Sequence, residues 1–467
     1  MLKKCLSVGL MALVVLFCSP DLTVHANDFG VRKPKFRGED FKTACELVRD
    51  ADIDWSRNEI MWQGIVDDLG VFHWENTDKK IKKMLKYGKV NIFCTLKCVH
   101  ELFAPGSGKV DLEYKARWKS APPAPGYLDE YEDFVRQIVE RYDGDGVSDA
   151  GFITAGKNVK HWQVETEPGK KPDDQGSHYW EGTAADYADH FLVTYDAIKQ
   201  ADQDATIALA GFHRGSIKYH MNHGDSFVLQ VLNVLDQNGG DFDIFDFHFL
   251  GGDYAEIRKL DKTVHSILKT YNQFSDKPVW VTEVALNKED PDPWWTPDEH
   301  NAFQAKELVK RFTLFFWRGM EKVFWVKFAD QKDAIWNAPM APGDFEAFRG
   351  LTDQYLTPKP AYYTYKLLIE KKSKKTVRKE RDMESIDDMW VFRIGGTSEP
   401  VYIMWYDSPY YESAEISIPV PWSTSRVTHI ITEAGITEPD TEIIPTTLEG
   451  NLEITLDDGP VFVEQYF

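Results

Sequence analysis

The chain has 467 residues, of which 43% are hydrophobic and 13% aromatic, and it carries a formal net charge of −21. A chain of this length and apolar content buries at least one large core and is not a largely disordered protein. The negative charge argues against nucleic acid or an anionic membrane as the partner, because both are bound by positively charged surfaces. It fits a protein that acts on a neutral partner.

The N-terminus has the pattern of a secretory signal. Lys3 and Lys4 precede an apolar run from Cys5 to Cys18, and small residues follow at Val24-His25-Ala26. We expect residues 1–26 to be removed and the protein to be secreted, to the periplasm or outside the cell. The bulky Phe17 before Cys18 argues against lipidation, and no later segment has the length and apolarity of a membrane span.

Without the signal, the chain keeps Cys45, Cys94 and Cys98. Three cysteines do not make a disulfide framework, so the core must hold the fold together. The spacing of Cys94 and Cys98 does not match a metal site, and we expect buried thiols or a single bridge.

Apolar strand-like runs alternate with helical patterns from about residue 28 to 370, which predicts βα units around a parallel sheet. Eight runs are present, the number that closes a (β/α)8 TIM barrel. They lie near Phe29–Lys33, Ile53–Arg57, Val90–Leu96, Val159–Glu167, Ala205–Phe212, Asp243–Phe249, Val279–Glu283 and Val323–Phe328. Capping boxes beginning at Thr183 and Thr296 predict two of the helix starts.

The pattern changes after Glu370. The basic stretch 371–375 is expected to be a solvated connector, and short alternating runs follow it, as in a small antiparallel β-sandwich. These runs are Met389–Ile394, Val401–Tyr406, Ala414–Ile418, Val427–Thr432, Leu452–Leu456 and Val461–Gln465. We therefore predict a barrel domain over residues 27–370 and a sandwich over residues 371–467.

Two of the barrel strands end in a glutamate. Glu167 closes the segment His161-Trp162-Gln163-Val164-Glu165-Thr166-Glu167-Pro168, and Glu283 closes Pro278-Val279-Trp280-Val281-Thr282-Glu283. The C-terminal ends of parallel strands are where barrels of this kind place their active sites. Two converging carboxylates are what acid-assisted cleavage of a glycosidic bond requires.

These segments resemble the retaining glycoside hydrolases of clan A, with features of families 39, 42 and 5. The first is similar to the clan's Trp-x-x-x-Asn-Glu-Pro acid/base motif, and the second to its nucleophile strand. The resemblance implies a retaining glycosidase that cleaves a β-linked oligosaccharide or polysaccharide without a cofactor or metal. It implies Glu167 as the general acid/base and Glu283 as the nucleophile.

The resemblance also implies four further site residues. Arg57, in Trp55-Ser56-Arg57, falls where an arginine supports the nucleophile, and His248 falls where a sixth-strand histidine lines the pocket. Trp325 falls where a tryptophan forms the pocket floor. The tyrosine that usually contacts the nucleophile is replaced by Leu250, and Tyr254 is the nearby substitute.

The second departure from the clan pattern is Thr166, which replaces the asparagine that contacts the sugar 2-hydroxyl. A hydrogen bond to a group that develops charge contributes roughly 1.5–3 kcal/mol, about 10- to 150-fold in rate. We expect the threonine hydroxyl to supply part of this contact.

The residues also indicate how the two glutamates would differ. Arg57 beside Glu283 would keep that carboxylate ionised, and apolar walls together with the negative Glu283 would keep the proton on Glu167. Gln163, Glu165 and Glu167 share strand parity, so strict alternation would turn all three inward. Either a bulge resets the parity or one of the other two joins the site.

Two other functions fit part of the pattern. The replacements at Thr166 and Leu250 would suit a non-catalytic glycan-binding protein, although both glutamates are present. A metal-dependent barrel enzyme could use Asp246, His248 and the two glutamates as ligands, but one histidine among carboxylates is a small set. The sequence does not reveal the sugar, the linkage, internal or terminal cleavage, or the oligomeric state.

Overall fold

A computed structural model describes residues 27–32, 38–112, 115–169, 179–223, 226–286, 292–337, 339–340, 344–384 and 386–467. The predicted signal at residues 1–26 lies outside these ranges. Within them, no helix combines the length and apolarity that crossing a bilayer requires. Cys45, Cys94 and Cys98 are buried thiols that form no disulfide.

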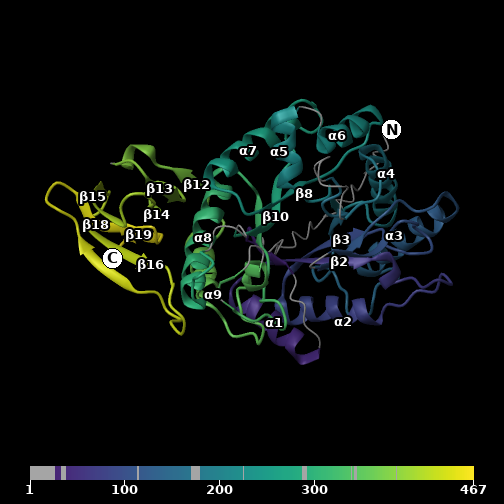
Figure 1. The fold of residues 1–467 in the computed structure, drawn as a ribbon, viewed down its shortest axis with the longest axis horizontal. Helices are drawn as coiled ribbons and strands as arrows, with labels where there is room; N and C mark the ends of the chain where they lie inside the picture. Colours follow the sequence, from purple (N-terminus) through teal and green to yellow (C-terminus); the bar gives the residue numbers. More distant parts are fainter. Residues whose placement is uncertain are drawn as a thin grey trace, which may run out of the picture.

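The larger part of the chain forms the predicted barrel (Figure 1). A parallel sheet has the order β7-β6-β3-β2-β1-β11-β10-β9-β8, and β7 and β8 are two pieces of the fifth barrel strand. The bridge between Ala208 and Ile244 joins that strand to the sixth and closes the ring. The strands are β1 Phe29–Arg32, β2 Trp55–Met61, β3 Asn91–Lys97, β6 His161–Val164, β7 Thr206–Ala208, β8 Phe212–His213, β9 Phe245–Leu250, β10 Val279–Ala285 and β11 Lys322–Trp325.

Helices cover the outside of this sheet. Capping boxes at Thr183 and Thr296 begin α4 and α8, as the sequence predicts. The helices are α1 Gly38–Asp50, α2 Glu75–Lys83, α3 Leu128–Tyr142, α4 Ala184–Ala201, α5 Arg214–His223, α6 Phe227–Gln237, α7 Tyr254–Leu268, α8 Pro297–Trp317 and α9 Pro360–Lys372. Short helical turns are η1 Trp62–Gly64, η2 Met84–Gly88, η3 Pro125–Tyr127, η4 Asp344–Phe348 and η5 Arg381–Met383. A hairpin that the sequence did not predict, β4 Gly108–Leu112 and β5 Lys115–Lys119, follows β3.

One end of the barrel interior is filled by apolar side chains. Gly30 is required in β1 because a Cβ there would lie 2.5 Å from the Phe324 ring. This apolar layer seals the barrel below the polar residues that follow on the same inner faces. Its members are Trp55, Phe93, Ala208, Ile244, Trp280 and Phe324.

The C-terminal part forms antiparallel sheets, in agreement with the predicted sandwich. A six-stranded sheet has the order β12-β13-β14-β19-β16-β17, and β15 pairs with β18. In Figure 1, α8 and α9 lie between these sheets and the rest of the barrel. The strands are β12 Val377–Lys379, β13 Met389–Ile394, β14 Val401–Tyr406, β15 Ser413–Pro419, β16 Thr424–His429, β17 Thr441–Pro445, β18 Asn451–Asp457 and β19 Val461–Gln465.

The two parts share contacts. Thr364 of α9 exchanges hydrogen bonds with the backbone of Ile431, and Lys306 of α8 pairs with Asp458 at 2.6 Å. The basic stretch is not wholly solvated as expected, because Lys372 is buried and its ammonium lies 2.5 Å from Asp28 of the barrel. Polar and ionic contacts therefore join the sandwich to the outer helices of the barrel.

Candidate active site

Polar side chains occupy the barrel interior above the apolar layer, toward the C-terminal ends of the strands. The Arg57 guanidinium donates to Thr95 Oγ1 and Gln163 Oε1, each at 3.1 Å, and Gln163 donates to Asp246 Oδ2 at 2.6 Å. Each of these four side chains is fully or almost fully buried. This buried network holds Arg57 directly from β3 and β6, and through Gln163 from β9.

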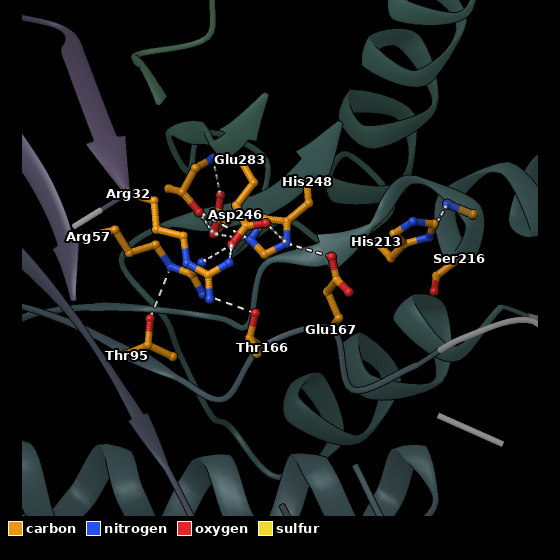
Figure 2. Close-up of polar contacts among 12 residues, drawn as sticks. Arg32, Arg57, Thr95, Thr166, Glu167, His213, Ser216, Asp246, His248 and Glu283 are labelled. Carbon is orange, nitrogen blue, oxygen red and sulfur yellow. Dashed lines mark hydrogen bonds and ion pairs between the residues drawn. The ribbon is translucent and has the colours of Figure 1, made fainter. Parts of the chain in front are cut away.

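Glu283 receives two guanidinium groups. Arg57 Nη1 lies 2.6 Å from Glu283 Oε1, and Arg32 Nη1 of β1 lies 3.4 Å from the same oxygen (Figure 2). Burial alone would raise the pKa of this carboxyl, but the positive charges of Arg32, His248 and Arg57 outweigh it and lower the pKa below 4.5. Glu283 is therefore held as a carboxylate.

His248 lies between the two glutamates (Figure 2). Its Nδ1 is 2.8 Å from Glu167 Oε1 and 3.9 Å from Glu283 Oε2. Burial opposes the charged imidazolium, yet Glu283 and Glu167 raise the pKa of His248 above its ordinary value of 6.5. The sequence predicted apolar walls around Glu167. The structure differs in one contact, because the buried His248 lies against the Glu167 carboxyl group.

The two glutamates meet across the barrel although they come from the fourth and seventh strands. One side-chain oxygen of Glu167 and one of Glu283 lie within 4.8 Å of each other, with His248 in the same group. Carboxyl groups about 5–5.5 Å apart are typical of retaining glycosidases, whereas inverting enzymes separate theirs by about 6.5–9.5 Å. This upper limit for one pair of oxygens favours the retaining geometry over the wider inverting one.

The end of β6 shows in which direction its polar side chains point. Glu165 and Glu167 both adopt positive φ angles, 66° and 46°, so the strand does not continue its alternation. Gln163 faces inward, whereas the fully buried Glu165 accepts a hydrogen bond from the Cys98 backbone at 2.5 Å. Thr166 lies between Glu165 and Glu167 in the chain, and its Oγ1 accepts a hydrogen bond of 3.0 Å from Arg57 Nη2.

The buried carboxylate of Asp246 lies close to the His248 ring. Asp246 accepts hydrogen bonds from the Thr282 backbone at 3.1 Å and from the Thr282 hydroxyl at 2.5 Å. Its Oδ2 lies 3.8 Å from His248 Nε2. Gly211 completes this packing, because a Cβ there would lie 2.1 Å from His248 Nε2.

The structure does not place Tyr254 and Trp325 as predicted. The Tyr254 hydroxyl bonds to Glu307 on α8, and its ring contacts Trp390 of the sandwich, so it does not replace the missing tyrosine. Trp325 follows Phe324, which belongs to the inner layer, so alternation turns Trp325 outward against α8. Its indole N–H donates to the Arg349 carbonyl at 2.8 Å, and it does not form a pocket floor.

Sequence reasoning missed several charged residues of the site. Arg32 pairs with Glu59 at 2.9 Å as well as with Glu283, and Lys97 ends β3 on the inward-facing side. Beyond Glu167, His213 Nδ1 accepts a hydrogen bond from the Gly215 backbone (Figure 2). The sequence did hold a signal for these residues, because each lies at the last position of a predicted strand or directly beside it. They are Arg32, Lys97 and His213.

Two groups have the ligand types and spacing of a metal site among the described residues. Glu167, His248 and Glu283 form one, but Glu283 already pairs with two guanidinium groups that a cation would have to displace. Asp246 does not belong to this group, because it binds Thr282 beneath it. The second group, which consists of Asp143, Asp145 and Asp149, mainly accepts hydrogen bonds from nearby backbone N–H groups.

Neither a protein-family model nor a curated protein sequence matches this chain. Solved structures do. A family 39 glycoside hydrolase from the gut symbiont Bacteroides cellulosilyticus WH2 is 18% identical with a TM-score of 0.66, over 94% of this chain and 81% of that one. A monomeric β-xylosidase from Caulobacter crescentus CB15 is 16% identical with a TM-score of 0.63, over 94% and 96%.

A third neighbour is the family 51 α-L-arabinofuranosidase of Thermotoga petrophila RKU-1, which is 11% identical with a TM-score of 0.58 over 91% of this chain and 90% of that one. These neighbours are glycoside hydrolases, and at this level of identity the likeness concerns the fold. The expected barrel with a C-terminal sandwich is confirmed, as is the resemblance to glycoside hydrolases at the level of the fold.

Proposed function

We propose that this protein is a retaining glycoside hydrolase that cleaves a β-linked glycan by double displacement. The supporting observation is the pair formed by Glu167 and Glu283, whose oxygens lie within 4.8 Å at the C-terminal end of the barrel. Arg57, buried and 2.6 Å from Glu283, makes the two carboxyl groups chemically different. The glycosidase fold of the neighbours adds to this support.

In the first step, Glu283 attacks the anomeric carbon of the sugar. The bond from that carbon to the leaving oxygen breaks, Glu167 gives its proton to that oxygen, and a covalent glycosyl–Glu283 ester forms. Arg32 and Arg57 suit Glu283 to this role, because they hold it ionised before the attack.

In the second step, Glu167, now a carboxylate, removes a proton from water. The water oxygen bonds to the anomeric carbon, the ester bond to Glu283 breaks, and the sugar leaves with its original configuration. His248, 2.8 Å from Glu167 Oε1, orients that carboxyl group through both steps.

Thr166 is assigned to the sugar 2-hydroxyl. Its Oγ1 accepts a hydrogen bond from Arg57, so the hydroxyl hydrogen remains for a substrate oxygen. Arg57, Thr166 and His248 are therefore the proposed substrate-pocket residues.

The protein is further proposed to be secreted. The support is the charged and apolar pattern of residues 1–26 followed by Val24-His25-Ala26. Cell fractionation with an antibody against the mature chain, and N-terminal sequencing of the product, test this. Material kept in the cytoplasm with residues 1–26 attached would contradict it.

The test of the activity begins with 4-nitrophenyl β-D-xyloside, after the β-xylosidase neighbour, and 4-nitrophenyl β-D-glucoside. Wild type should cleave at least one, NMR of the fresh product should show retained configuration, and Glu283→Gln should be inactive. Glu433→Gln, an exposed position on the sandwich, is the matched control. Inverted product or an active Glu283→Gln enzyme would refute the mechanism, and glycan binding without turnover would favour the non-catalytic alternative.

A further inference from the structure

A groove of about 640 Å³ lies beyond the C-terminal end of β2. Because parallel strands present their C-terminal ends on one face, the groove opens on the same face as Glu167 and Glu283. The mechanism above uses none of its residues. They are Met61, Gln63, Gly64, Val66, Asp67, Asp68, Leu69 and Trp118.

The inner face of β2 leads from the catalytic pair to the groove. Alternation puts Arg57, Glu59 and Met61 on the same side of the strand as the apolar-layer residue Trp55. Arg57 contacts Glu283, Glu59 contacts Arg32 beside it, and Met61 lines the groove. Four residues of strand span roughly 13 Å, which places the groove beyond a single sugar held at Glu283.

Trp118 is anchored from the barrel at the edge of this groove. It belongs to β5, where it pairs with Lys109, and its backbone carbonyl accepts a hydrogen bond of 2.9 Å from Lys97 Nζ. Lys97 is 3% exposed and lies 5.5 Å from the ring centre of Tyr179. Among the described residues no carboxylate forms an ion pair with this ammonium, so its attachment to Trp118 is its main polar contact.

The groove has the chemistry of a sugar subsite. The Trp118 indole offers a flat apolar face, and Leu69 is 88% exposed at the same groove. Asp67 is engaged in its own loop by the Leu69 and Val71 backbone and by His73. Gln63 and Asp68 then supply the polar side chains that hydroxyl groups require.

We propose that this groove is a second sugar-binding subsite that holds another residue of the same glycan, stacked on Trp118. This inference rests on the proposed glycosidase function and extends it, because it assigns an oligosaccharide or polysaccharide rather than a simple monosaccharide glycoside as the substrate. The two acidic residues of the groove favour a neutral sugar over a sulfated or uronic one.

The test compares two substrates of one sugar. The first is the 4-nitrophenyl glycoside that wild type cleaves fastest, and the second is the β-linked hexasaccharide of that sugar, xylohexaose for a xyloside or cellohexaose for a glucoside. Trp118→Ala should lower kcat/KM for the hexasaccharide roughly tenfold or more and leave the aryl glycoside within about twofold. Trp118→Phe should recover much of the loss, and Tyr410→Ala, an 84% exposed aromatic on the sandwich, should change neither.

Activity on the aryl glycoside reports that each variant is folded, so a misfolded variant is recognised at once. Equal loss on both substrates, or no loss on the hexasaccharide, would overturn the subsite. Calorimetric titration of Glu283→Gln with the same hexasaccharides distinguishes failure of the subsite from failure of the proposed function. If wild type cleaves nothing, weaker hexasaccharide binding by a Trp118→Ala, Glu283→Gln double variant still supports the subsite, and unchanged or undetectable binding overturns it.

Discussion

Arg57 Nη1 lies 2.6 Å from Glu283 Oε1 although 226 residues separate the two positions in the chain. Both side chains come from the inner face of the barrel, and neither is accessible to water to any large extent. A buried ion pair of this kind is costly to break, because the remaining charge is left without a partner. The pair therefore links the fold directly to the ionisation of the proposed nucleophile.

Replacing Arg57 tests this link. Arg57→Met should cost at least the roughly 1.5–3 kcal/mol of one charged hydrogen bond, a loss of about 10- to 150-fold in kcat/KM. Removing a positive charge also raises the pKa of Glu283, so the acid limb of the pH–rate profile should move to higher pH. Arg57→Lys keeps the charge and should move that limb less, and an unmoved limb in Arg57→Met would contradict the assignment.

The acid role of Glu167 is separable from the nucleophile role by the leaving group. Glu167→Gln should slow the first step strongly for an aryl glycoside with a poor leaving group, such as 4-methoxyphenol. It should slow this step far less for 2,4-dinitrophenol, which departs without a proton. Pre-steady-state burst measurements on both substrates check this, with Glu165→Gln as a neighbouring carboxylate control. Equal losses on the two substrates would remove Glu167 from the acid role.

Thr166 tests whether a hydroxyl replaces the clan's asparagine. Thr166→Val keeps the shape but removes both the acceptor for Arg57 and the donor for a sugar. We expect a loss of about 10- to 150-fold in kcat/KM on a glycoside with a 2-hydroxyl, and a much smaller loss on its 2-deoxy analogue. Thr166→Ser should retain most activity. A Thr166→Val enzyme that treats both substrates alike would show that Thr166 does not contact this position.

Opposite pKa shifts at Glu283 and His248 predict a two-sided pH dependence of stability. The lowered pKa of Glu283 stabilises the fold above pH 4.5, and this is lost as the pH falls through the folded-state pKa. The raised pKa of His248 stabilises the fold below pH 6.5, and this is lost as the pH rises through the folded-state pKa. Thermal midpoints of wild type and Glu283→Gln across this range measure both effects.

The Glu283→Gln variant should lose the part of the acid-side decline in stability that protonation of Glu283 causes. It should also begin the alkaline decline at lower pH, because the negative charge that raises the pKa of His248 is gone. Superimposable profiles for the two proteins would show that the pair does not couple to folding.

Local pattern was sufficient to predict the eight barrel strands and to single out Glu167 and Glu283, and the family resemblance added Arg57, Thr166 and His248 to the same group. Local pattern failed where the outcome depended on whether a side chain points into or out of the barrel. Trp325 lies outside the barrel because its neighbour Phe324 fills the inner layer, and the sequence does not reveal which of the two adjacent aromatic residues turns inward.

Other errors came from distant parts of the chain. Tyr254 is attached to Glu307 on α8, a partner that no spacing near Tyr254 indicates. Arg32 ends a first strand that Gly30 and Pro34 made short and uncertain, and its contact with Glu283 depends on closure of the ring. The positive φ angles of Glu165 and Glu167 decide a strand parity that the sequence had left open.

Gly211 shows how close that packing is. A Cβ at this position would lie 2.1 Å from His248 Nε2 and 2.8 Å from Asp246 Oδ2, and both neighbours are fully buried. Gly211→Ala must therefore displace His248 from Glu167, with a cost of 1–3 kcal/mol or more for overpacking, estimated roughly from core substitutions. We expect a lower thermal midpoint and a large loss of kcat/KM. Gly151→Ala, where a Cβ meets no atom within 4 Å, is the matched control and should behave as wild type. An active, equally stable Gly211→Ala enzyme would mean that His248 need not occupy its place between the two glutamates.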